Sequence, residues 1–293
     1  MSAKAKSRKR SKRLLSNDRP AFPTRGHKTT SLSSKVTRTL IRSHHTLHKR
    51  LKQAETAGEI ARANEIRLQI ETQGGLAKYQ QASIQGQSSQ RGGDSSKLLI
   101  EWLQELGLST TEHTKLRLLE VGALRVDNAC SRCGIFDVVR IDLNSQHEQI
   151  LQQDFMTRPM PVDEADREEN GFDVISLSLV LNYIPDPVGR GEMLKIVASF
   201  LRRALQNEQL NTFPGLYLVL PRPCITNSRY LDEAMLEAMM SSLGYVMTRT
   251  KLSSKLAYYY FRYVWDQPTV SQAFTKKELR KASNMNNFAI VLQ

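Results

Sequence analysis

From residue 116 onward, apolar residues occur in short runs that polar stretches separate. The run Leu116 to Gly122 (LRLLEVG) has only Arg117 and Glu120 as polar members before its glycine, a pattern typical of one short buried strand. Four later runs predict further strands: Phe136–Leu143, Ile150–Asp154, Phe172–Val180 and Gly215–Leu220.

Helical patterns lie between these runs. Asp94–Leu106 is amphipathic and begins at an aspartate that suits an N-cap. Further helices are predicted over Arg190–Leu205 and over Asn227–Leu243, where Gly244 ends the second one. Strands that alternate with helices predict an α/β fold with a doubly wound sheet. Three β-rich runs then predict an antiparallel end to this sheet: Tyr245–Thr250, Ala257–Val264 and Phe288–Leu292.

The first third of the chain has a different organisation. Residues 1–33 are poor in apolar side chains and predict a disordered basic tail. Ser34–Gln73 has a helical pattern that Gly74 ends, and Gly75–Gly93 reads as an irregular connector rich in glycine and glutamine. We therefore expect a tail, a helical extension with its connector (34–93) and an α/β domain over 94–293. The extension is interpreted either as an RNA-contacting surface or as a packing lid.

Charge is concentrated in the tail. The chain carries a formal charge of +13, but residues 1–52 alone hold 16 Lys and Arg against one acid, Asp18. The cluster from Ser7 to Arg13 (SRKRSKR) is typical of a nuclear localisation signal or of an arm that binds nucleic acid. Phosphate backbones attract such arms through counterion release.

Other classes of protein are disfavoured. No apolar run approaches the roughly 18 residues that a membrane span needs, and the basic start lacks the apolar core of a signal peptide. We therefore expect a soluble protein in a reducing compartment. Cys130 and Cys133 form a C-x-x-C pair, but structural zinc needs four ligands and no second pair is present. Ordinary thiols and no metal are expected.

Three polar signals follow successive predicted strands. Gly122, two residues after the acid Glu120, allows a close approach of the backbone to a ligand. Asp142 comes about twenty residues later, a spacing that suits a carboxylate on a ribose diol. Asp154 and Phe155 place an acid beside an aromatic ring, where an adenine could stack. Each signal alone is commonly a turn or a cap, but the three in this order predict a site for S-adenosylmethionine (SAM).

Two further features bear on this site. The motif is not G-x-G-x-x-G, which disfavours a dinucleotide. Arg91 lies beside Gly92 and Gly93, where it could face the methionine carboxylate of SAM or be an ordinary loop arginine.

With these residues in place, the chain resembles the fungal large-subunit (25S) rRNA adenine-N(1)-methyltransferases. The resemblance rests on GGLAKYQQASIQGQ, RGGDSSK with the helix after it, LLEVGAL, RIDLNS, QQDFM, FDVISLSLVLNYIPDPVGRGEML, LYLVLPRPCITNSRY and NNFAIVL. It implies a Rossmann-like class I SAM-dependent methyltransferase fold, a location in the nucleus and nucleolus, and SAM contacts at Gly122 and Asp142. A related animal group shares these segments but acts as a SAM sensor, and there the residues matching Asp154, Phe155, Ser178 and Arg91 also face SAM.

The resemblance implies a SAM-dependent enzyme that methylates N1 of an adenine in 25S rRNA, within large-subunit rRNA or a pre-ribosomal particle. The alternatives are a SAM sensor without methyl transfer and a methyltransferase for small molecules or proteins. The basic tail favours RNA. Because N1 of adenine already carries an in-plane lone pair, no catalytic base is required and we assign no catalytic residue. Asn182, Tyr183 and Asp186 follow the fourth strand, where the target base is expected.

Overall fold

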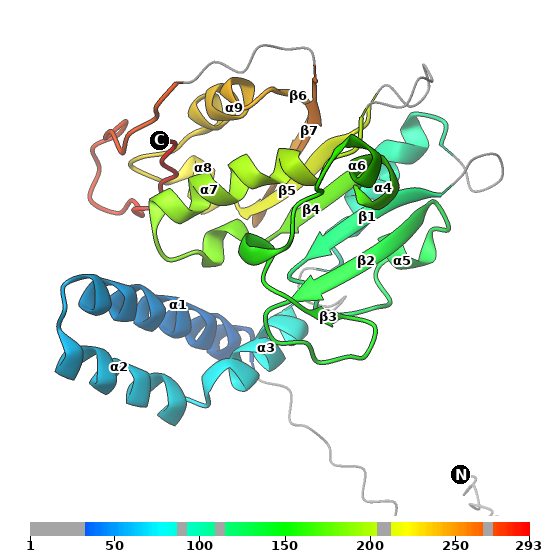
Figure 1. Cartoon of the computed structure of the whole chain (residues 1–293). Coiled ribbons are helices and arrows are strands. Elements are labelled where there is room, and N and C mark those ends of the chain that lie inside the picture. The colour runs from blue at the N-terminus through cyan, green and yellow to red at the C-terminus, as the bar shows by residue number, and fades with distance from the viewer. Residues whose placement is uncertain (1–32, 87–92, 109–114, 204–211, 266–271) are drawn as a thin grey trace, which may run out of the picture. The chain divides into compact units, whose positions relative to one another are not determined.

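The structure is a computed structural model that describes residues 33–86, 93–108, 115–203, 212–265 and 272–293 (Figure 1). The tail predicted to be disordered, residues 1–33, falls outside these ranges except for Ser33, and Arg91 also falls outside them. Within the described ranges, no helix is long and apolar enough to cross a membrane.

One sheet of seven strands forms the centre of the protein, in the order β3-β2-β1-β4-β5-β7-β6 (Figure 1). The strands are β1 (Leu116–Val121), β2 (Phe136–Asp142), β3 (Leu151–Gln152), β4 (Val174–Ser178), β5 (Gly215–Pro221), β6 (Tyr245–Leu252) and β7 (Leu256–Tyr263). The first five strands pair in parallel, and β7 runs antiparallel to both β5 and β6. This arrangement is the Rossmann-like class I fold that the resemblance implies, and the predicted antiparallel ending is confirmed.

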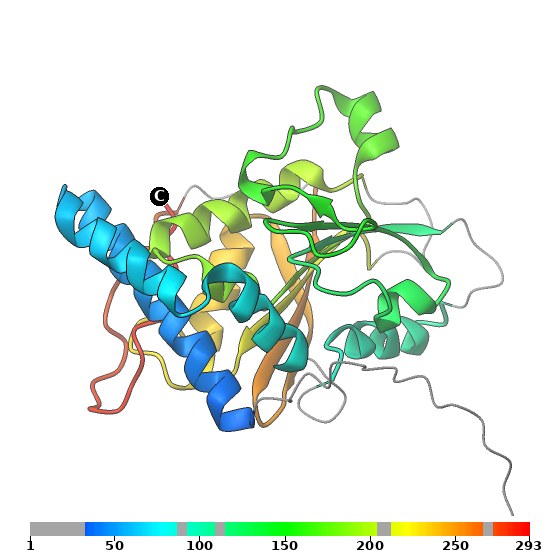
Figure 2. The same ribbon diagram turned by 90° about the horizontal axis from the view of Figure 1, so that it is seen from below.

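Helices cover both faces of the sheet (Figure 2). One face packs against α4 (Ser96–Glu105) and the short α5 (Ala129–Arg132), and the other against α7 (Pro187–Val197) and α9 (Glu233–Ser242). Because side chains alternate along a strand, Leu118 packs on the face that α4 and α5 cover, and Leu119 packs on the face that α7 and α9 cover. Strands that are buried on both faces explain the continuous apolar runs in the sequence.

The smaller elements lie in the connections. They are α6 (Glu164–Asn170), α8 (Pro223–Thr226) and three single 3₁₀ turns, η1 (Phe155–Thr157), η2 (Leu181–Tyr183) and η3 (Ala198–Phe200). The stretch that contains α6 is polar throughout, and the helix buries none of its side chains, which explains why its sequence lacks helical periodicity.

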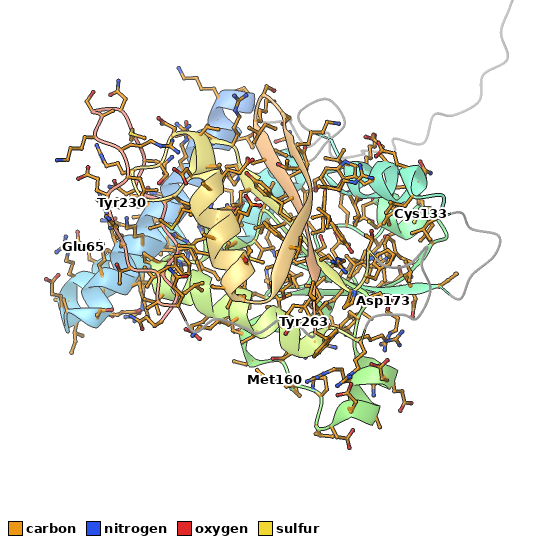
Figure 3. All side chains as sticks on the ribbon, turned by 90° about the horizontal axis from the view of Figure 1, so that it is seen from above. Glu65, Cys133, Met160, Asp173, Tyr230 and Tyr263 are labelled. Atoms are coloured by element: carbon orange, nitrogen blue, oxygen red, sulfur yellow. The ribbon has the colours of Figure 1, made fainter. Side chains whose placement is uncertain are left out.

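Asp173, which is labelled in Figure 3, holds the starts of β1 and β4 together through hydrogen bonds with the backbone of Arg117. The backbone N–H of Arg117 donates to the Asp173 carboxylate at 2.6 Å, and Arg202 lies 3.6 Å from the same group. Burial raises the pKa of Asp173, while the Arg117 hydrogen bond and the Arg202 charge oppose that shift. With their starts fixed in this way, β1 and β4 end side by side, at Val121 and Leu177 in register.

The helical extension consists of α1 (Ser34–Thr56), α2 (Ile60–Thr72) and α3 (Gly75–Gly86). Leu47 and Ala54 of α1 are buried against Ala63 and Ile66 of α2. The turn between these two helices contains Gly58 at φ +71°, a left-handed conformation that glycine adopts without strain.

The sequence prediction was wrong about the connector. Residues 75–86 form α3, whereas Gly75–Gly93 was expected to be irregular. The glycines of this segment weaken its helical pattern in the sequence. In the structure, Tyr79 and Gln80 of the helix are buried by contacts with other parts of the fold. Tertiary contacts therefore override a weak local pattern here.

Three other boundaries differ from expectation. The helix predicted from Arg190 begins at Pro187, because Asp186 accepts the Gly189 N–H at 2.7 Å as its N-cap. The helix predicted over Asn227–Leu243 begins only at Glu233, as α9, after its N-cap Asp232; α8 ends at Thr226, before the predicted range. The run Phe288–Leu292 lies outside the seven-stranded sheet, and Leu292 forms an isolated bridge with Phe274.

Candidate cofactor-binding site

A cavity of about 220 Å³ opens at the carboxyl ends of β1 and β4. It is lined by Gly93, Asp94, Ser95, Lys97, Glu120, Val121, Gly122, Leu124, Arg125, Asp127, Asn128, Arg132 and Ser178. In the strand order of the sheet, the direction of winding reverses between β1 and β4. Ligands of open α/β sheets bind at such a reversal, so the cavity lies where a ligand is expected.

Gly122 lines this cavity. Its φ of +71° is strained for any residue with a Cβ, and a Cβ placed there would lie 2.8 Å from Cγ2 of Val180. Its N–H donates to the Ile141 carbonyl at 2.8 Å, which keeps the turn close to β2. The backbone therefore passes tightly between β2 and the segment after β4, and only glycine fits without movement.

Glu120 is the most perturbed acid of the site. Its Oε1 accepts a hydrogen bond from Asn128 Nδ2 at 2.7 Å, whereas Oε2 is covered and has no partner within the described part of the chain. Burial raises the pKa of Glu120 to about 7, although the Asn128 hydrogen bond and the Arg140 charge oppose this shift. A covered carboxylate oxygen without a donor is costly, and a cationic ligand group in the cavity would supply one.

The start of α4 closes one side of the cavity. The Oγ atoms of Ser95 and Ser178 lie 2.7 Å apart, which joins this helix to the end of β4. Asp94 was expected to cap the helix, and its Oδ1 does accept the Ser96 N–H at 2.9 Å, although the helix itself begins at Ser96. Its other oxygen accepts from the N–H of Ala129 at the start of α5. Asp94 therefore joins α4 to α5.

Cationic side chains also line the cavity. They are Lys97, Arg125 and Arg132, and Arg125 is paired with Asp127 at 2.7 Å. Arg91, the cation predicted for this site from the sequence, lies outside the described residues. The three observed cations were missed because lysines and arginines in helices and loops have no spacing that marks them as ligand contacts.

Asp142 ends β2 and does not line the cavity. Its Oδ1 accepts hydrogen bonds from the Asn144 N–H at 2.8 Å and from Gln80 Nε2 at 3.1 Å. Burial raises the pKa of Asp142, and these two hydrogen bonds oppose the shift. The predicted proximity of this strand end to the glycine turn agrees with the register, which pairs Val121 with Ile141.

Sequence reasoning also missed Gln80. Besides Asp142, its Nε2 donates to the Asn144 carbonyl at 2.7 Å, and its Oε1 accepts from Asn144 Nδ2 at 2.7 Å. This buried amide therefore makes three hydrogen bonds, one to the last residue of β2 and two to Asn144 in the loop after it. It attaches α3 to the edge of the candidate site.

The side chains of Asp154 and Phe155 have different surroundings in the structure. Asp154 caps η1 by accepting the Met156 N–H at 2.9 Å. The Phe155 ring is only 2% exposed, and its centroid lies 5.3 Å from that of Phe200 in the core. The expectation that this ring offers a stacking surface to adenine is therefore corrected: in this conformation its partner is Phe200.

The segment after β4 is strained and covered by the extension. Leu179 has φ of +60°, and Asn182 Oδ1 is buried without a partner among the described residues. The Tyr183 ring contacts His45 of α1 and Tyr79 of α3, with centroids 4.2 and 5.4 Å away. This aromatic contact places α1 and α3 over the segment where the target base is expected.

The C-x-x-C pair lies beside the cavity in α5 and its cap (Figure 3). Cys130 is buried, and the Cys133 thiol donates to the Cys130 carbonyl with an Sγ to oxygen distance of 3.2 Å. Over the described ranges, no three His, Cys, Asp or Glu side chains group as metal ligands.

Comparison with known proteins gives a consistent result. The family model described as "25S rRNA (adenine(2142)-N(1))-methyltransferase, Bmt2" matches residues 64–290. The chain is 38% identical over 255 residues to the 25S rRNA adenine-N(1) methyltransferase of Schizosaccharomyces pombe, covering 86% of this chain and 89% of that protein. It is 39% identical over 229 residues to the 25S rRNA (adenine(2142)-N(1))-methyltransferase of Saccharomyces cerevisiae, covering 76% of this chain and 62% of that protein.

Among solved structures, an O-methyltransferase family protein from Burkholderia thailandensis matches with a TM-score of 0.42 and 11% identity, over 76% of this chain and 71% of that one.

Proposed function

The chain belongs to the 25S rRNA (adenine-N(1))-methyltransferase family, and on that premise we propose that it transfers a methyl group from SAM to N1 of an adenine in large-subunit ribosomal RNA. The observation that carries the proposal is the cavity at Gly122, whose lining includes Glu120, an acid with one carboxylate oxygen that is buried and unpartnered among the described residues.

The residues of the cavity fit the methionine end of SAM. That end carries an ammonium group, a carboxylate and a sulfonium. The unpartnered Glu120 oxygen suits the ammonium group, and the cations Lys97 and Arg132 suit the carboxylate. Gly122 lets the ligand approach the backbone closely. Ser178 lies at the end of β4, where it borders the same space.

The ribose is assigned to Asp142. Carboxylates at the end of the second strand accept hydrogen bonds from ribose hydroxyls in folds of this type. Since Oδ1 already accepts two hydrogen bonds, the diol uses Oδ2 or replaces the Gln80 amide. Asp154, two residues beyond β3, is the second acid on this side and is assigned to the adenine amino group.

The chemistry places few demands on the protein. SAM supplies an electrophilic methyl group on its sulfonium. Because adenine N1 has an in-plane lone pair, the site must hold that pair in line with the methyl group and need not remove a proton first. The target edge is hidden in a base pair, so the enzyme has to act on an unpaired or extruded base. The segment after β4 borders Gly122 through Val180 and is where that base is proposed to lie.

The test is methyl transfer from labelled SAM to unmodified large-subunit rRNA transcribed in vitro. We expect label in the RNA and 1-methyladenosine in its nuclease digest, as identified by mass spectrometry. Label in N6-methyladenosine would contradict the assignment of the target atom. SAM binding by calorimetry without any transfer to RNA or pre-ribosomal particles would favour a sensor instead.

The proposed location is the nucleus and nucleolus, and it rests on the basic cluster from Ser7 to Arg13. Replacing the five Lys and Arg of this cluster with alanine should disperse a fluorescent fusion into the cytoplasm. Deleting residues 1–28 should also weaken RNA binding and flatten its salt dependence, with SAM affinity unchanged. A comparable loss of SAM affinity would contradict a separate role for the tail.

A further inference from the structure

Helix α1 uses its sides for different contacts (Figures 1 and 2). Leu47 and Ala54 pack against α2, while His44 and His45 contact the rings of Tyr79 and Tyr183. Lys35, Arg42, Lys49 and Arg50 are exposed on the remaining side, and we call these four residues the basic stripe. Lys35, Arg42 and Lys49 are seven residues apart. On an α-helix this spacing puts them on one side, about 10 Å from one another along the axis.

The charge of the basic stripe is not neutralised locally. Over the described ranges, no ion pair involves any of its four side chains, whereas Arg62 and Arg67 of α2 pair with Glu59 and Glu55. Between Asp18 and Glu55 the sequence contains no acid at all. The stripe therefore presents uncompensated positive charge to solvent.

Polar side chains complete the same surface. Thr39, Thr46 and Gln53 are exposed and lie between the basic residues around the helix. The Thr39 and Thr46 hydroxyls donate to the backbone carbonyls of Lys35 and Arg42 at 3.0 and 2.9 Å, whereas the side-chain amide of Gln53 is a donor of the kind that contacts phosphate oxygens. Leu47 and Leu51 of the helix pack with α2, and the basic stripe with its polar neighbours contains no apolar side chain that could enter a lipid membrane. Its chemistry matches a nucleic-acid backbone.

The basic stripe lies beside the candidate site. Arg42 and Lys49 stand three and four residues from His45, and residues at these spacings are neighbours on a helix surface. The His45 ring lies 4.2 Å from that of Tyr183, in the segment after β4. Val180 of that segment is the residue against Gly122. A strand bound along the stripe therefore passes next to the place proposed for the target base.

We propose that the basic stripe of α1 binds the phosphate backbone of the substrate RNA and directs the strand to the segment after β4. The inference rests on the proposed function for the identity of the RNA. The contacts are to phosphates, so they add affinity and position without reading the base sequence.

The experiment compares full-length Arg42→Gln/Lys49→Gln with wild type in RNA binding, measured by fluorescence anisotropy on a large-subunit rRNA fragment without SAM. At 0.1 M salt each lost phosphate contact weakens binding about fivefold, so the double variant should bind about 25-fold more weakly. The slope of log affinity against log salt should fall by about 1.4 for single-stranded RNA. Circular dichroism and SAM calorimetry establish that the variant is folded and that the cofactor site is intact.

Lys115→Gln is the matched control. Lys115 is exposed and directly precedes β1, at the amino-terminal edge of the sheet, which is opposite the site. The Lys115→Gln variant should leave the RNA affinity and the slope of log affinity against log salt unchanged. If the double variant binds RNA like wild type, or loses no more than the control, the basic stripe does not contact RNA and an acidic protein partner becomes the better reading. If the double variant loses RNA affinity while wild type transfers no methyl group, the stripe stands and the proposed function fails.

Discussion

The side-chain amide of Gln80 is hydrogen bonded to the carboxylate of Asp142, with 3.1 Å between Nε2 and Oδ1. The two residues belong to α3 and to the end of β2. The same amide makes two hydrogen bonds with Asn144. The helical extension is thereby attached to the acid that we assign to the ribose.

Gln80→Ala should destabilise the protein without weakening SAM binding. The buried amide makes three hydrogen bonds, and leaving Asn144 and Asp142 without it should lower the free energy of unfolding by about 1–3 kcal/mol. SAM affinity should hold or rise, because Oδ1 of Asp142 becomes available to the diol. Denaturant unfolding and calorimetric titration measure the two effects. Gln81→Ala, on the exposed side of the same helix, is the control and should change neither.

Asp142→Ala should weaken SAM binding about ten- to hundredfold. A charge-assisted hydrogen bond contributes on the order of 1.5–3 kcal/mol, and the alanine offers no acceptor to the ribose. Calorimetry on the folded variant decides the matter. Asp137→Ala changes an exposed acid on the same strand and should bind SAM like wild type. Equal affinities of wild type and Asp142→Ala would show that the end of β2 does not hold the ribose.

Gly122→Ala should be more damaging than the same change at Gly58. Both glycines have φ of +71°, but a Cβ at Gly122 meets Val180 at 2.8 Å, whereas one at Gly58 meets nothing within 4 Å. Left-handed strain alone costs about 1–2 kcal/mol, and the clash adds about 1–3 kcal/mol at Gly122. Thermal unfolding and SAM titration measure the difference. The double variant Gly122→Ala/Val180→Ala should recover the part that belongs to the clash. If it recovers nothing, strain rather than the contact is the cause. A longer side chain, as in Gly122→Arg, should exclude SAM altogether.

Glu120→Gln should stabilise the protein without cofactor above pH 7 and leave it unchanged near pH 4. Burial raises the folded-state pKa from 4.5 to about 7, so the folded state binds the extra proton between these values. Stability is therefore full below the unfolded pKa and falls by up to ~3 kcal/mol as the pH rises to about 7. The glutamine variant lacks this loss. Denaturant unfolding from pH 4 to pH 8 measures it, with exposed Glu237→Gln as the control.

The same glutamate predicts a pH dependence of SAM binding. A cationic ligand favours ionised Glu120, so wild-type affinity should rise between pH 6 and pH 8 as the carboxyl group ionises at about 7. The affinity of Glu120→Gln should be lower and nearly constant over this range. A wild-type affinity that is flat, or that falls with pH, would mean that the ammonium group binds elsewhere.

The sequence was sufficient to predict the residues at the strand ends, but it was insufficient to predict the residues of the helical extension that contact them. Gly122 and Asp142 were predictable, because apolar runs mark parallel strands and the ends of neighbouring parallel strands meet at one edge of the sheet. Gln80 was not, since a glutamine in a glycine-rich segment shows no periodicity and its partner lies 62 residues away. The predicted stacking of adenine on the Phe155 ring was wrong for another reason. An acid followed by an aromatic residue does not specify which side of the backbone the ring takes, and packing against Phe200 decided it.

The contacts among His45, Tyr79 and Tyr183 join three segments that are far apart in the chain. Burial lowers the pKa of His45 to about 4, so the ring is neutral at physiological pH and packs as an aromatic group. A change in the size of any one ring leaves the other two with a gap or an overlap. Among relatives of this protein, the three positions should therefore be inherited as a unit, with a substitution at one accompanied by compensating substitutions at the others.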